Sequence, residues 1–149
     1  MSAALCIDAS VAAKWLIPEA DSDRAEALLT DALRQGIQLV APPHLDVEVT
    51  SALYKRVRAK EVTADEAKAR LGDYALIPME LLSPTGLAER AMEIALGFDW
   101  ALPYDAFYLG LGELLGCEVW TADAALYKDA HGSYAELHLL SEYELSFHS

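Results

Sequence analysis

Short apolar runs alternate with amphipathic helical segments along the chain, and this alternation constrains the fold more than any other feature of the sequence. A helix between two strands carries the chain back across the sheet, so that consecutive strands run parallel. The sequence therefore predicts an α/β fold with a mostly parallel sheet. The expected strands span 4–8, 37–41, 77–82, 118–122 and 136–140, and the expected helices span 10–16, 22–35, 43–60, 85–96 and 104–115, with another beginning at Thr63.

The limits of several helices can be read from their end residues. Thr63 and Glu66 have the spacing of a capping box, which begins a helix. Gly97 is expected to end the helix at 85–96. The segment 104–115 is apolar almost all round, so we expect it to be buried.

Length and cysteine usage limit the class of protein. A chain of 149 residues fits one domain, and we expect a single domain over 1–149. No run of about 20 apolar residues is present and the N-terminus lacks a signal-peptide pattern, so we expect no membrane association. Cys6 and Cys117 lie in apolar surroundings without zinc-site spacing, which predicts two free thiols in a cytoplasmic protein.

The formal net charge of −13 argues against a general nucleic-acid binder, because such proteins usually carry a basic surface. Divalent cations held by some of the carboxylates would weaken this objection, and the acidity also suits a basic protein partner. Any nucleic acid must be held locally. Lys55, Arg56, Arg58 and Lys60 could grip phosphates, or they could form an ordinary solvated helix end that interacts favourably with the helix dipole.

Two aspartates lie at the ends of expected strands. Asp8 ends the first strand, and Asp123 follows the strand at 118–122. Ligands of open parallel sheets bind outside the carboxyl ends of the strands, so the two acids face one crevice if their strands are neighbours. Each could instead cap the helix that follows it.

Two further acids lie close to apolar surfaces. Glu48 falls near Leu45 and Ala52 on a helical wheel, at the edge of the apolar stripe. Asp105 enters the most hydrophobic helix of the chain, where an N-cap role would also explain it. A carboxylate in such a place costs desolvation free energy unless a cation or a hydrogen bond compensates it.

Together these four carboxylates suggest a metal site. A carboxylate cluster without histidine favours hard cations such as Mg²⁺ or Mn²⁺ over zinc. Cations of this kind catalyse phosphodiester hydrolysis by acidifying bound water and by neutralising the phosphate and the leaving oxygen. The sequence therefore predicts a metal-dependent nuclease.

The ordered set of motifs resembles the PIN-domain ribonucleases, and among them the VapC-like toxins of toxin–antitoxin pairs. The matching segments are IDAS at 7–10 with KWL at 14–16, PxLxxEV at 43–49, YDAxYL at 104–109 and WTADAAL at 120–126.

The resemblance implies a three-layer α/β/α domain that cleaves RNA with Mg²⁺ or Mn²⁺, often as a homodimer, and that a small VapB-type antitoxin neutralises. Asp8, Glu48, Asp105 and Asp123 fall on the acidic quartet of the family, which implies metal binding and catalysis. Thr121 falls where the family usually carries a Ser or Thr that orients water or a carboxylate, and Ser10 falls on the small hydroxyl residue after the first aspartate.

Two other signals carry less weight. The glycines of GLGELLG at 110–116 lie inside a helix, which favours close helix packing over nucleotide binding, although Gly110 and Gly112 should each cost that helix up to ~1 kcal/mol relative to Ala. The four histidines are scattered, and packing explains each of them. Two other functions remain open: a catalytically idle PIN-like module that binds protein, and a structure-specific DNA nuclease that uses the same metal chemistry.

Overall fold

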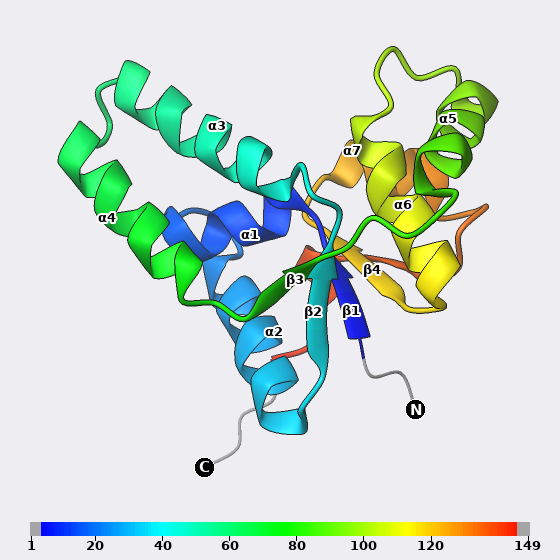
Figure 1. Cartoon of the computed structure of the whole chain (residues 1–149). Helices are drawn as coiled ribbons and strands as arrows, with labels where there is room; N and C mark the ends of the chain where they lie inside the picture. Colours follow the sequence, from blue (N-terminus) through cyan, green and yellow to red (C-terminus); the bar gives the residue numbers. More distant parts are fainter. Residues whose placement is uncertain (1–3, 146–149) are drawn as a thin grey trace.

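A five-stranded sheet forms the centre of the molecule in the computed structural model, which describes residues 4–145 (Figure 1). All described strands are parallel, in the order β3-β2-β1-β4-β5. The predicted α/β class is therefore confirmed. The strands are β1 (Ala4–Ile7), β2 (Gln38–Ala41), β3 (Met79–Leu81), β4 (Glu118–Thr121) and β5 (Leu137–Leu139).

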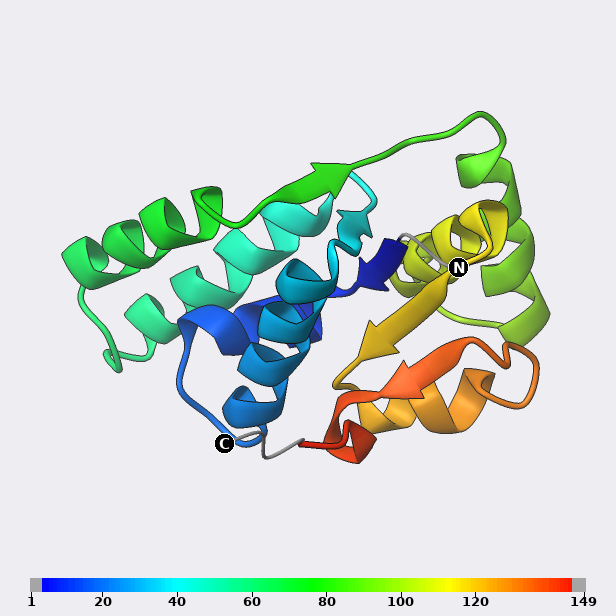
Figure 2. The ribbon, with the colours of Figure 1, turned by 90° about the horizontal axis from the view of Figure 1, so that it is seen from below.

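Helices cover both faces of this sheet and give the three layers (Figures 1 and 2). The first four, α1 (Ala9–Leu16), α2 (Ser22–Gln35), α3 (Leu45–Arg58) and α4 (Ala64–Ala75), gather on one side, and α3 and α4 form a hairpin that extends away from the sheet. On the other side, α5 (Leu87–Phe98) packs on α6 (Tyr104–Leu115), and α7 (Ala124–Ala130) joins β4 to β5.

Two expected helix features needed correction. The helix predicted to end before Gly97 runs through that glycine and ends at Asp99, which adopts the left-handed conformation with φ 56°. A helix interior tolerates glycine at modest cost, so Gly97 alone does not end α5. In α6 the middle is buried as predicted, but Leu114 and Leu115 are 45% and 40% exposed. The predicted cap of α4 is present, since Thr63 accepts a hydrogen bond from the Glu66 amide.

Close packing explains one of the two glycines of α6. A Cβ at Gly112 would lie 2.2 Å from Val119 Cγ2, whereas one at Gly110 would lie 3.3 Å from the flexible end of Leu87. Gly112 therefore lets α6 lie directly on β4. Glycine lowers the helix propensity of α6 slightly at this position, but a larger residue there would keep α6 from touching β4.

Two other expectations can be compared with the structure. Within residues 4–145 no helix is long and apolar enough to cross a membrane. Cys6 and Cys117 are both free and buried, as predicted.

Candidate active site at the carboxyl edge of the sheet

Asp8 and Asp123 follow two strands that are neighbours in the sheet. The sequence alone did not show whether these strands are adjacent. β1 pairs with β4, and the Asp8 amide donates a hydrogen bond to the Trp120 carbonyl across this pair. Both acids therefore lie at the same carboxyl edge of the sheet, where parallel sheets bind their ligands.

Asp8 is the most deeply buried acid of the four. Its side chain is only 4% exposed, and its Oδ1 accepts hydrogen bonds from Ser10 Oγ at 2.5 Å and from the Val11 amide at 3.2 Å. Burial raises the pKa of Asp8 from 3.8 to about 7, because the apolar surroundings disfavour the charged form more than the hydrogen bonds favour it. Proximity to Asp105 raises it further.

Two hydroxyl groups join the segments that carry Asp8 and Asp123. Ser10 Oγ lies 3.3 Å from Thr121 Oγ1 and accepts a hydrogen bond from the Ala122 amide at 2.8 Å. Thr121 Oγ1 accepts one from the Asp123 amide at 3.1 Å. Because Thr121 is fully buried, its hydroxyl can position its neighbours but cannot reach a substrate.

The capping interpretation is correct for two of the acids and wrong for a third. Asp8 caps α1, and Asp123 caps α7 through hydrogen bonds from the Ala125 and Leu126 amides. Asp105 lies in the first turn of α6 and is not its N-cap. Capping uses one carboxylate oxygen, so it does not exclude a second role for the other.

Asp105 is the common neighbour of the other acids. It is half-buried, and burial raises its pKa, as do the charges of Glu48 and Asp123. Its charge also raises the pKa of Asp8. These mutual effects place the four carboxylates in one electrostatic cluster.

Glu48 differs from the other three because two side chains hold it in the ionised form. Tyr108 Oη donates a hydrogen bond to Glu48 Oε1 at 2.8 Å, and His44 Nε2 lies 3.1 Å from the same oxygen. Partial burial opposes ionisation, but these two contacts outweigh it and lower the pKa of Glu48. His44 Nε2 also lies 3.1 Å from the Tyr104 carbonyl. Both partners of Nε2 are acceptors, so this nitrogen carries a hydrogen.

His44 packs against the rings of Tyr104, Phe107 and Tyr108, as the sequence predicted for the histidines, but it is also part of the site through its contact with Glu48. Its spacing of four residues from Glu48 on one helix was the available signal. Tyr108, which is 1% exposed, was also missed, because its contact with Glu48 is made between two helices far apart in sequence.

Two hollows flank the acids. Glu48, His44 and Tyr104 line a groove of about 650 Å³ that continues along α3 to Lys55 and Arg56. A second hollow of about 310 Å³ has Asp105, Asp123 and Asp129 in its lining, and Asp129 was not singled out from the sequence.

The basic segment of α3 contributes less free charge to the groove than its composition suggests. Arg56 contacts Glu19 and Glu61 at 2.6 Å each, so two glutamates already neutralise it. Lys55 is exposed and lines the groove, whereas Arg58 and Lys60 do not line it. Of the four basic residues, Lys55 therefore provides the accessible charge nearest to Glu48.

All four acids lie at the N-termini of helices. Asp8 and Asp123 are N-caps, and Glu48 and Asp105 lie in first helical turns. The positive ends of four helix dipoles therefore point toward this edge of the sheet, where they favour carboxylates and bound phosphate.

The chemistry of the donors fits a hard divalent cation. Within residues 4–145 none of the four acids has a Lys or Arg partner at ion-pair distance, although two of them are raised in pKa by burial and by like charge. No three of these acids bring carboxylate oxygens within 4.8 Å of one another in the described chain. Mg²⁺ usually binds one or two carboxylates directly and keeps several waters, so at this spacing some of the acids would hold the cation through its waters.

Comparisons with known proteins agree with this geometry. The model of the PIN domain family matches residues 5–131. The chain is 33% identical over 106 residues to VapC ribonuclease Mb0985 of Mycobacterium bovis, in a match that covers 67% of this chain and 80% of the relative. Ribonuclease VapC9 of Mycobacterium tuberculosis matches with the same identity and coverage. The chain belongs to the PIN-domain family.

Proposed function

We propose that this protein is an endoribonuclease of the VapC type, the toxin of a toxin–antitoxin pair, and that it hydrolyses RNA phosphodiester bonds with Mg²⁺ or Mn²⁺. The observation that carries the proposal is the cluster of four acids at the carboxyl edge of the sheet without Lys or Arg partners among the described residues. The identity to VapC ribonucleases supports RNA as the substrate.

Each acid has a role that follows from its surroundings. Asp8, Asp105 and Asp123 are the main ligands of the cation. Glu48 completes the shell directly or through water, since its lowered pKa suits a ligand better than a general base. When bound, the cation supplies an acidified water and neutralises the charge that develops on the phosphate and the leaving oxygen.

Ser10 and Thr121 act on the acids instead of on RNA. Ser10 donates a hydrogen bond to Asp8 Oδ1, and Thr121 accepts one from the Asp123 amide. Together the two hydroxyl groups fix the separation of these two ligands. His44 and Tyr108 hold Glu48 in the same way. We propose that all of these are positioning residues.

Metal-dependent cleavage tests the function directly. The purified protein should degrade total RNA with Mg²⁺ or Mn²⁺ and should stop when EDTA is added, while single-stranded DNA of matched length stays intact. Gel electrophoresis of both polymers measures this. Cleavage of DNA alone would favour the structure-specific DNA nuclease. RNA that stays intact with every cation would favour a catalytically idle protein-binding module.

The groove along α3 predicts where RNA is held. Lys55→Gln should weaken RNA binding and flatten its salt dependence, by about 0.7 in log–log slope for each phosphate that the protein no longer neutralises. Arg58→Gln is the matched control, since it removes the same charge from the same helix outside the groove. Binding isotherms at several salt concentrations compare the two variants. Equal salt slopes for the two variants would mean that Lys55 belongs to an ordinary solvated helix end and does not hold RNA.

Partners and location complete the proposal. The net charge of −13 and the acids beside the groove favour a small basic antitoxin of the VapB type. Large exposed apolar side chains such as Met92, Leu96 and Leu102 favour a homodimer. We expect one domain to occupy the chain, in the reducing cytoplasm that two free thiols suit.

A further inference from the structure

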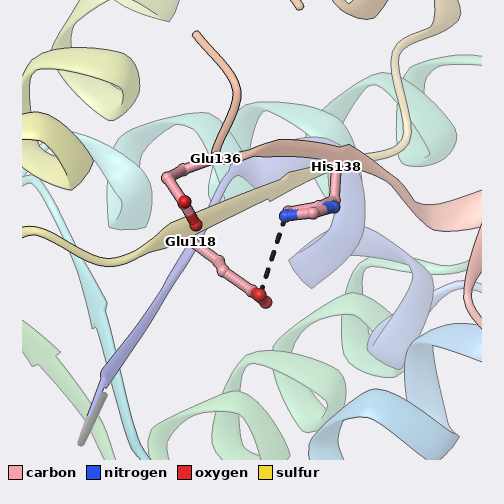
Figure 3. Close-up of side chains that lie close together, drawn as sticks. All are labelled: Glu118, Glu136 and His138. Carbon is pink, nitrogen blue, oxygen red and sulfur yellow. Dashed lines mark ion pairs between the residues drawn. The ribbon is translucent and has the colours of Figure 1, made fainter. Parts of the chain in front are cut away.

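Two glutamates and a histidine lie close together near the start of β4 and β5, away from the four acids. Glu118 begins β4, and His138 lies in β5. The pairing of Val119 with Leu137 sets Glu118 beside Glu136, and His138 follows two positions later on the same face. Figure 3 shows the three side chains close together on the two neighbouring strands.

The ligand atoms of this group already lie at near-coordinating separations. One carboxylate oxygen from each glutamate and one imidazole nitrogen lie within 4.8 Å of one another, and His138 Nε2 is 3.6 Å from Glu118 Oε2. Zinc bonds of about 2.0–2.1 Å set tetrahedral ligand atoms roughly 3.4 Å apart, so small side-chain movements would close the site. Among residues 4–145 it is the one such group of three that the structure contains.

The charges in this group are unbalanced. Glu118 begins β4 and Glu136 directly precedes β5, so two like charges lie side by side where these strands begin and repel each other. Within residues 4–145 neither has a Lys or Arg at ion-pair distance, and His138 is the sole ion-pair partner of Glu118. A bound cation would turn this repulsion into attraction.

Trp120 orients two of the three ligands. Its indole N–H donates a hydrogen bond to Glu118 Oε1 at 3.0 Å, and its ring stacks on that of His138 with centroids 5.0 Å apart. Neighbours that fix the orientation of ligands in this way are typical of metal sites.

We propose that Glu118, Glu136 and His138 bind a late first-row divalent cation of the Zn²⁺ type, with water at the remaining position. The imidazole distinguishes this site from the all-carboxylate cluster, because nitrogen ligands favour zinc-like ions over Mg²⁺. Asp123 follows Glu118 by five positions, ~16 Å along an extended chain, so the two sites are separate. The cation ties β5, whose single sheet neighbour is β4, to the rest of the sheet.

Zinc binding in a large excess of Mg²⁺, which competes for the carboxylate cluster, tests the proposal on the full chain. Calorimetry should detect one Zn²⁺ site, and Co²⁺ at this site should quench the fluorescence of Trp120. His138→Gln and Glu136→Gln should each weaken Zn²⁺ binding at least tenfold and remove the rise in melting temperature that Zn²⁺ produces. His44→Gln is the control, since it removes the other histidine that contacts a glutamate.

The results separate this site from the carboxylate cluster. Loss of Zn²⁺ binding in the His138 and Glu136 variants, with binding kept by His44→Gln, supports the proposal. Wild-type affinity in Glu136→Gln, whose exposed position makes the variant safe for folding, overturns it. So does loss of Zn²⁺ binding in His44→Gln, or the absence of any Zn²⁺ site in Mg²⁺.

Discussion

The Asp105→Asn variant should lose metal-dependent RNA cleavage by at least ~100-fold, since changes to groups that only support metal ligands already cost 10–100-fold. The charge of Asp105 interacts with those of the other three acids, so its loss should weaken the binding of a cation among them. The asparagine should leave the fold intact, because Asp105 does not cap α6. Initial rates of RNA cleavage in Mn²⁺, together with circular dichroism, measure both expectations.

A matched control separates a loss of metal binding from a change in net charge. Asp65 lies in the first turn of α4, so Asp65→Asn removes the same charge from the same kind of helical position, away from the site. This control should keep the wild-type rate, while Asp8→Asn and Asp123→Asn should lose activity as Asp105→Asn does. If two of these three site variants keep wild-type rates, the assignment of the site is wrong.

The contribution of Asp8 to the stability of the metal-free protein should fall as the pH rises from about 4 to about 7. The pKa of Asp8 is about 7 in the folded state and near its ordinary value of 3.8 in the unfolded chain. Over this interval the folded state binds more protons than the unfolded state, so the free energy of unfolding falls with pH and then levels off. Thermal melts in EDTA across this range measure the decrease.

Asp8→Asn isolates the contribution of this carboxyl group. Asparagine keeps the oxygen that accepts hydrogen bonds from Ser10 and Val11 but removes the charge. Above pH 7 in EDTA the variant should therefore melt higher than wild type. In Mn²⁺ the variant should gain much less than the wild type, which a cation at a hundredfold excess over its dissociation constant stabilises by ~2.7 kcal/mol. A variant that melts lower in EDTA, beside a wild type that does not respond to Mn²⁺, would mean that Asp8 is only a cap.

The sequence allowed the sheet and the general place of the acids to be predicted. Apolar runs of five to six residues separated by helices leave few alternatives to a parallel sheet. Asp8 and Asp123 follow two of these strands directly, so strand ends alone brought them to one edge. The choice between cap and ligand could not be made from spacing, because one carboxylate has oxygens enough for both.

What the sequence did not reveal depends on contacts between distant segments. Tyr108 reaches Glu48 across sixty positions, and Arg56 is neutralised by Glu19 across thirty-seven. Neither pair has a local signal, so the ionised state of Glu48 and the small free charge of the groove required the fold. Gly112 is similar, since its cost to the helix is visible in sequence while the approach of Val119 is not.

The central position of β1 has a consequence for how the protein is made. β1 can pair with β2 early in synthesis, but its other pairing waits for β4, which begins at residue 118. Until β4 docks, Asp8 and Asp123 belong to segments that have not met. The proposed carboxylate site therefore cannot assemble before β4 has been made and has paired with β1. So late a pairing also slows folding, because a long loop must close before β1 and β4 can pair.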